Sequence, residues 1–142
     1  MGIARGLKPN HPPDRSGGAI IESKQKALIA ATAAQEKKGQ NPTIIDLEGR
    51  SDYADYIVIV TTYSERQCQA VAEAVAQCLK KDHGIQPVAK EGDGVWVLID
   101  YGDIVVHVFH EDARAYYDLD KLWADAPRVR VPALEYERAR AV

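Results

Sequence analysis

The residues best suited to acid–base or metal chemistry gather in one short stretch, where His107 and His110 are followed by Glu111 and Asp112. Imidazole and carboxylate groups can ligate a metal ion or exchange protons. In a strand, however, a spacing of three sends the two imidazoles to opposite faces, and a metal site needs further ligands that no second cluster in the sequence supplies. We therefore expect no metal site here and no cofactor.

Two pairs of aspartates form the next candidate site, since Asp100 and Asp103 flank one expected turn and Asp52 and Asp55 lie in another. Nucleotidyl-transferring enzymes hold two metal ions with such carboxylates. Aspartate is also common in turns, because its carboxylate bonds to local backbone N–H groups. The turn role is favoured, since neither the G-x-G-x-x-G nor the G-x-x-x-x-G-K phosphate-binding pattern occurs in the sequence. A metal-dependent nucleotidyltransferase that uses Asp52, Asp55 and Asp100 is the alternative.

Residues 91–125 combine six of the ten aromatic residues with nine acidic residues against Arg114 and Lys121, a net charge of −7. The six aromatic residues are Trp96, Tyr101, Phe109, Tyr116, Tyr117 and Trp123. Exposed Trp and Tyr beside charges are typical of interface anchors, and concentrated negative charge favours basic partners. Two other interpretations are open: a solvated acidic rim, and a Trp96 that packs beneath a helix.

The elements that must position these residues follow from hydrophobic periodicity and from turn residues. The expected elements are a helix from about residue 20 to 38, strands at 43–47 and 56–62, a helix from the Ser64/Gln67 capping box to Gly84, an edge strand at 86–90, a hairpin of strands 95–100 and 104–109, and helical turns over 111–123. This order predicts an α/β fold: a mixed sheet of about five strands flanked by helices. Strand 56–62, the helix after it and the next strand are expected to form a crossover.

Strand alternation divides the hairpin into two faces. Val97 and Ile99 share one face with the even-numbered aliphatic residues of strand 104–109, which predicts that this face is buried in the core. Trp96 and Asp100 share the other face with His107, and this second face carries the polar and aromatic residues. The sequence therefore predicts a docking surface on the second face.

Composition restricts the class of protein further. The chain has 142 residues, 46% hydrophobic and 27% charged, which fits one globular domain. A net charge of −3 does not favour general nucleic-acid binding. Two cysteines without a C-x-x-C motif are typical of a reducing compartment, and no apolar run approaches the length of a membrane span, so a cytoplasmic location is expected. We expect a disordered leader over residues 1–19, a single domain over 20–127 and a flexible or partly helical tail over 128–142.

One long pattern identifies a family. Ser51-Asp-Tyr-Ala-Asp-Tyr56 leads into a buried strand, Arg66-Gln67 opens an alanine-rich helix, and Trp96-Val-Leu-Ile-Asp-Tyr-Gly-Asp-Ile-Val-Val-His-Val-Phe-His110 follows. The pattern continues through Arg114-Ala-Tyr-Tyr-Asp-Leu119 to Asp125-Ala-Pro127. Over about residues 21–129 the chain resembles the ribosomal silencing factor family, also called Iojap-related. The leader and the Arg-rich tail depart from the family pattern, and whether either contacts ribosomal RNA is an open question.

The resemblance implies a non-enzymatic protein with a nucleotidyltransferase-like α/β fold that is commonly a homodimer. It implies binding to the basic large-subunit ribosomal protein numbered fourteen, at the face where the small subunit docks, so that subunit joining is blocked and translation is repressed. On the predicted docking surface we expect three aromatic anchors, one arginine that organises carboxylates or bonds the partner, and polar or charged residues around them. These residues are Trp96, Tyr101, Tyr117, Arg114, Asp100, Asp103, His107, Glu111 and Asp118.

Overall fold

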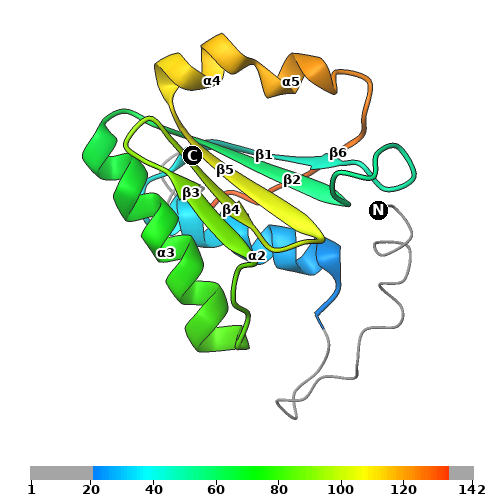
Figure 1. Cartoon of the computed structure of the whole chain (residues 1–142), viewed down its shortest axis with the longest axis horizontal. Helices are drawn as coiled ribbons and strands as arrows, with labels where there is room; N and C mark the ends of the chain where they lie inside the picture. The colour runs from blue at the N-terminus through cyan, green and yellow to red at the C-terminus, as the bar shows by residue number, and fades with distance from the viewer. Residues whose placement is uncertain (1–20, 135–142) are drawn as a thin grey trace.

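The structure is a computed structural model that describes residues 21–134. Its helices are α2 (Ser23–Glu36), α3 (Glu65–His83), α4 (Glu111–Tyr117) and α5 (Leu119–Leu122). Its strands are β1 (Gln40–Asp46), β2 (Tyr56–Thr62), β3 (Ala89–Gly92), β4 (Trp96–Asp100), β5 (Ile104–His110) and β6 (Arg128–Val129) (Figure 1). The expected leader over 1–19 and the end of the expected tail lie outside the described residues.

The strands form one mixed sheet in the order β3-β4-β5-β2-β1-β6. β2 and β5 pair in parallel, and every other neighbouring pair is antiparallel. The predicted α/β fold with a mixed sheet is thus confirmed, although the sheet has six strands and not about five. The crossover through α3 is wider than expected, because β2 pairs with β5 and not with the strand that directly follows α3.

Several element boundaries differ from the sequence-based expectation. The edge strand begins at Ala89 and not at residue 86, since Pro87 has no N–H to donate to β4. The helical segment after β5 is divided at Asp118, whose positive φ of 47° ends α4 before α5 begins. Residues 128–129, expected in the tail, form β6 and pair with Ile44 and Ile45 of β1.

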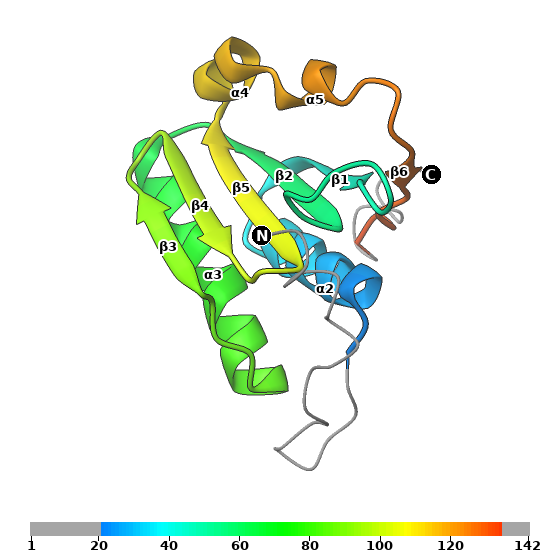
Figure 2. The same cartoon turned by 45° about the vertical axis from the view of Figure 1, so that its right-hand side comes forward.

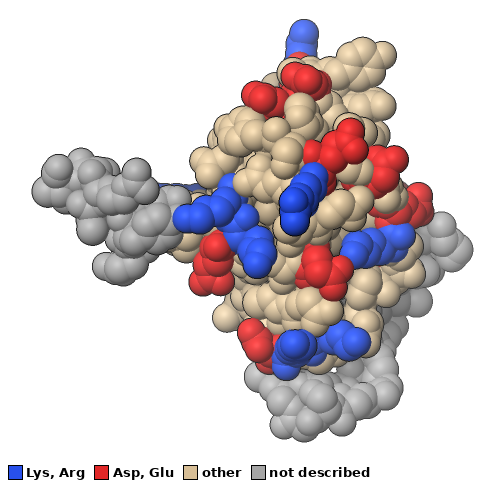
Figure 3. Space-filling model, turned by 90° about the vertical axis from the view of Figure 1, so that its left-hand side faces the viewer, with Lys and Arg blue, Asp and Glu red and all other residues tan. Residues whose placement is uncertain are grey.

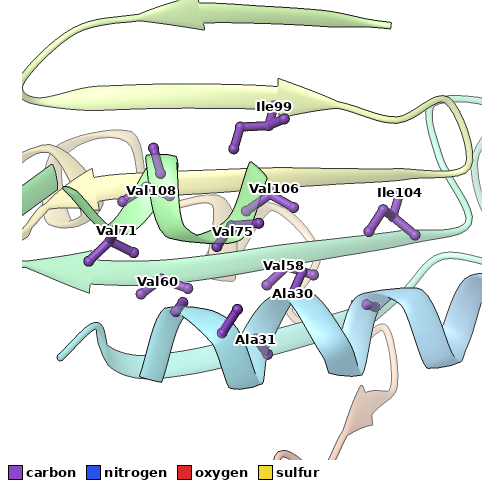
Figure 4. Packing of buried hydrophobic residues seen from close by; sticks show 14 of the residues in the cluster. Ala30, Ala31, Val58, Val60, Val71, Val75, Ile99, Ile104, Val106 and Val108 are labelled. Atoms are coloured by element: carbon purple, nitrogen blue, oxygen red, sulfur yellow. The ribbon is translucent and has the colours of Figure 1, made fainter. Parts of the chain in front are cut away.

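Helices cover both faces of the sheet. α2 and α3 lie against one face, and α4 and α5 lie across the other (Figures 1 and 2). Ile99, Ile104, Val106 and Val108 lie in the core between the sheet and helices α2 and α3, as the strand alternation predicts (Figure 4). Val97 belongs to the same core cluster. Alanines at positions 27, 30, 31 and 34 are fully buried, and their small side chains let α2 lie close to the sheet.

Local sequence signals begin and end α3 where they were expected. The Ser64 hydroxyl accepts a hydrogen bond from the Gln67 N–H at 3.0 Å, and Gly84 ends the helix in the left-handed conformation. Cys68 and Leu79 lie on its buried face, and neither Cys68 nor Cys78 is in a disulfide. No helix within residues 21–134 has the length and apolar character needed to cross a bilayer.

Gly39 has a different role from the helix stop that its position suggests. The residue with positive φ after α2 is Lys38, at 76°, whereas Gly39 is buried against β2. A Cβ at Gly39 would lie only 2.6 Å from a methyl group of Val60. Glycine is therefore needed here for the close approach of the backbone to the sheet.

Candidate docking surface

The second face of the sheet has a small apolar core of its own. It is formed by Ile45, Leu47, Ile57, Ile59, Phe109 and Ala126, with Trp96, Ala113, Leu119 and Trp123 packed against it. α4, α5 and the chain after them lie over this core (Figure 2). Residues 111–126, which carry five of the nine acidic residues and three of the six aromatic residues of 91–125, thus form a cover on one side of the sheet.

Trp96 lies half-buried at the centre of an aromatic cluster. Its ring centroid is 4.5 Å from that of Tyr117 in α4 and 5.0 Å from that of Phe109 in β5. Its indole N–H donates to Nδ1 of His107 at 3.0 Å. Trp96 therefore packs beneath α4, as one interpretation of the sequence had it, and Tyr117, another of the predicted anchors, lies over it.

His107 is buried, with only 3% of its surface exposed. Since the Trp96 N–H can only donate, Nδ1 of His107 accepts, and the ring proton lies on Nε2, which is 3.5 Å from the Tyr53 hydroxyl. Burial lowers the pKa of His107 to about 4, so the ring is neutral at pH 7. His107 thus contacts Trp96 and Tyr53 from the sheet side. The prediction that it lies on the surface was wrong, because these residues bury it.

Arg114 belongs to α4, and its side chain is buried. Its guanidinium donates to both carboxylate oxygens of Asp120, at 3.1 and 3.0 Å. It also donates to the Thr61 and Thr43 hydroxyls and to the backbone oxygen of Asn41. Arg114 therefore ties the cover to β1 and β2, and its donors are used within the chain.

Tyr101 and Asp103 lie on the opposite side of the sheet from the aromatic cluster. The Tyr101 ring is buried in the α2/α3 core, where burial raises its pKa to about 12. Asp103 accepts hydrogen bonds from Ser23 at 2.6 Å and from Lys26 at 3.0 Å, both in α2. Placing these two residues on the docking surface was wrong, because the hairpin turn between Asp100 and Ile104 directs them toward α2.

We expect Asp103→Asn to lower the free energy of unfolding by about 1–2 kcal/mol at pH 7, because a neutral amide loses the attraction of Lys26. Burial raises the pKa of Asp103, but the Ser23 hydrogen bond and the Lys26 charge outweigh it and hold the pKa below its usual range. The difference between the proteins should thus persist above about pH 4 and vanish as the pH falls through the lowered pKa. Urea unfolding checks this, with the exposed Asp125→Asn as control; equal loss in both variants would contradict it.

The exposed part of the cover carries the remaining predicted residues. Glu111 and Asp118 are exposed, and Tyr117 is 48% exposed. Two further side chains of this segment that were not among the predicted site residues are more exposed, Tyr116 at 82% and Leu122 at 64%. The exposure of Tyr116 could have been predicted from the sequence, since the 3.6-residue helical period places it on the solvent side when Arg114 and Tyr117 face inward. We use the name α4–α5 surface for the following set of residues: Glu111, Asp112, Tyr116, Tyr117, Asp118 and Leu122.

Of the aspartates of the enzymatic alternative, Asp100 ends β4, and Asp52 and Asp55 lie in the loop before β2. Asp100 accepts the Gly102 N–H at 2.7 Å, and Asp52 is exposed in the loop before β2. Within residues 21–134, no three His, Cys, Asp or Glu side chains lie close enough together to hold a metal ion.

The fold and this surface define a small α/β protein with one helical layer packed into its core and a second layer that presents aromatic and acidic side chains. A family model described as "Ribosomal silencing factor during starvation" matches residues 20–142. The chain therefore belongs to this family, which confirms the resemblance found in the sequence.

Relatives and solved structures agree with this assignment. The ribosomal silencing factor of Bacillus subtilis is 46% identical over 107 residues, which cover 72% of this chain and 90% of that protein. The one from Halalkalibacterium halodurans is 43% identical over 112 residues, 77% of this chain and 95% of that protein. A crystal structure of a Chromobacterium violaceum protein superposes with a TM-score of 0.70 at 32% identity, covering 81% of this chain and 93% of that one. A Bacillus halodurans structure gives a TM-score of 0.63 at 40% identity, over 72% and 94%.

Proposed function

We propose that this chain binds the large ribosomal subunit and sterically blocks its joining with the small subunit, which represses translation. The family assignment and the name that the relatives carry, ribosomal silencing factor, support a regulatory role at the ribosome. The observation that carries the proposal is the α4–α5 surface, where exposed apolar side chains stand among exposed carboxylates. Such a surface suits a basic protein partner, because apolar contacts supply affinity and charge complementarity speeds association.

The partner we propose is the basic large-subunit ribosomal protein numbered fourteen, at the intersubunit face. Tyr117 and Leu122 supply apolar contact area, and Glu111 and Asp118 supply negative charge. On the side of the molecule that carries α3, lysine and arginine side chains are interspersed with carboxylates (Figure 3). That mixed side is less suited to a strongly basic partner, so the α4–α5 surface is the better candidate.

In this proposal the chain acts by binding and not by catalysis, and it needs no cofactor. The body of the domain occupies the space of the incoming subunit, so binding energy alone produces inhibition. The enzymatic alternative is tested by incubation with labelled nucleotides and Mg²⁺, where turnover would favour a nucleotidyltransferase. A homodimer, a cytoplasmic location and contacts of the two chain ends with ribosomal RNA stay predictions.

We expect the double variant Glu111→Lys/Leu122→Lys to bind large subunits at least about thirtyfold more weakly than the native chain, the loss typical of interface hot spots. Both side chains are exposed, so the substitutions leave the core intact. Co-sedimentation of purified protein with large subunits at several protein concentrations measures the affinity.

The control is Glu36→Lys/Val88→Lys, which replaces one acidic and one aliphatic side chain with lysine at exposed positions outside the α4–α5 surface. It has the same net charge as the test variant, so non-specific attraction to ribosomal RNA rises equally in both. Native-like binding of the control and loss in the test variant support the proposal. Equal binding of the two folded variants would refute the surface.

A further inference from the structure

An open groove lies beside the α4–α5 surface, between the first turn of α3, the start of β4 and the outer side of α4. Its lining is Glu65 from α3, Val95 before β4, and His110, Asp112, Ala113, Tyr116 and Tyr117 from the end of β5 and α4. Its volume is about 460 Å³. This falls within the roughly 300–1,000 Å³ of ordinary ligand sites.

Two aromatic rings form one side of the groove. Tyr116 and Tyr117 meet at 90° with their ring centroids 5.0 Å apart. Tyr117 is held in place from behind by Trp96, whereas Tyr116 is almost fully exposed. Two perpendicular rings present a face and an edge to the same space, and an aromatic face attracts cations.

The charges around the groove are negative. Glu65 and Asp112 are both exposed and come from different helices, and the described lining residues include no lysine or arginine. Helix N-termini usually favour anions, but those of α3 and α4 are already capped, by the Ser64 hydroxyl and by Nδ1 of His110. Each also carries an acidic residue in its first turn, so the groove favours a cation.

We propose that this groove receives the guanidinium group of an arginine side chain of the partner protein. A planar guanidinium stacks on tyrosine and donates to carboxylates on two sides at once, which the compact ammonium of lysine does less well. The arginine lies against Tyr116, between Glu65 and Asp112. This rests on the proposed function in one respect: the arginine belongs to the basic ribosomal protein that covers the α4–α5 surface.

The groove is tested first without ribosomes, by NMR titration of the ¹⁵N-labelled full-length chain with a capped Gly-Arg-Gly peptide. The same peptide with citrulline, which has the shape of arginine but no charge, is the matched probe. We expect the arginine peptide to shift the amide signals of Ala113, Tyr116 and Tyr117 and the citrulline peptide to bind at least about fivefold more weakly. Equal shifts with both peptides, or shifts elsewhere on the chain, would overturn the proposal.

Variants of the lining residues test which side chains of the groove bind the arginine. Tyr116→Ala and Asp112→Asn are each expected to weaken arginine binding about fivefold or more. Tyr63→Ala and Asp125→Asn make the same changes at exposed positions outside the groove lining and should bind like the native chain. If the control variants lose as much affinity as the groove variants, the assignment to the groove is wrong.

Co-sedimentation with large subunits separates this proposal from the proposed function. If native protein binds subunits and Tyr116→Ala binds equally well, the arginine site fails and the proposed function stands. If the arginine peptide binds in the groove but native protein does not bind large subunits, the proposed function fails and the cation site stands. Loss of subunit binding in Tyr116→Ala, with the Tyr63→Ala control intact, supports both.

Discussion

Replacing Arg114 with methionine is expected to lower the free energy of unfolding by about 3 kcal/mol, near the lower end of the range for breaking a buried ion pair. The lower end applies because the Asp120 carboxylate is about one-third exposed and can be hydrated once its partner is lost. Methionine keeps the apolar stem of the side chain, so the loss reports on the guanidinium. That group holds α4 and α5 on the sheet.

The expected loss of stability in Arg114→Met has several separate sources. Arg114 Nη1 is 2.7 Å from the Asn41 oxygen and 2.9 Å from the Thr61 hydroxyl, and Nη2 is 2.8 Å from the Thr43 hydroxyl. Without the guanidinium these acceptors are left in a partly buried site, where an unsatisfied polar group costs about 1–3 kcal/mol. Some of that cost is recovered by water that enters from the Asp120 side.

Urea unfolding at pH 7 measures the loss, with Lys121→Met as the control that removes an exposed cation from the same segment. Arg114→Lys should lie between native and Arg114→Met, because one ammonium group cannot reach acceptors on β1, β2 and α5 together. A loss below 1 kcal/mol in Arg114→Met would show that the cover is held by its apolar contacts alone.

The second large effect is a loss of stability at mildly acidic pH that depends on His107. Burial lowers the pKa of His107 from 6.5 to about 4 in the folded chain. Between these two values the unfolded chain binds a proton that the folded chain does not, so stability falls as the pH falls from about 6.5 to 4. The pKa difference corresponds to a loss of about 3 kcal/mol over the full window, at 1.36 kcal/mol per pKa unit.

The cause is specific to the position of the ring. A protonated His107 would turn Nδ1 into a donor that faces the Trp96 N–H, so the 3.0 Å hydrogen bond between them would be lost. The Tyr53 hydroxyl is 3.5 Å from Nε2 of the ring, and the charge of Asp100 acts on Tyr53. Neither supplies a strong hydrogen bond that would hold a charged imidazole in place.

His107→Gln separates this effect from the other groups that titrate in the same range. Glutamine can accept the Trp96 N–H but does not titrate, so the variant should lose less stability than native protein between pH 7 and 4.5. Denaturant unfolding at a series of pH values gives the two slopes, and His83→Gln is the control for loss of a histidine outside the core. Parallel slopes for native protein and His107→Gln would contradict the low pKa.

How far the sequence predicts the site depends on the range of the interactions involved. The period-2 alternation of β4 and β5 correctly separates Val97 and Ile99 from Trp96 and His107, because this pattern is a property of neighbouring residues. The same pattern does not tell whether the second face is covered as well. His107 was therefore expected at the surface, although Trp96 and Tyr53 contact its ring and it is buried.

Several errors concern contacts between distant parts of the chain. Asp103 is 80 residues from Ser23 and 77 from Lys26, and Arg114 is 73 from Asn41. β6 pairs with β1 across more than eighty residues, and its two residues carry no strand signal of their own. No local pattern encodes such pairings, because they depend on how the whole sheet brings the segments together.

By itself, then, the sequence determined the α/β class, the core face of the hairpin, both ends of α3 and the family, because each of these follows from residues close together or from one long pattern. Only the tertiary structure decided which aromatic and charged side chains of residues 91–125 are available to a partner. The cover, which Arg114 bonds to β1 and β2, packs over Trp96 and His107. The apolar side chains that stay exposed are therefore Tyr116, Tyr117 and Leu122. The physical reason is that exposure depends on what packs over a residue, and here the packing side chains come from the loop before β2 and from the helices after β5.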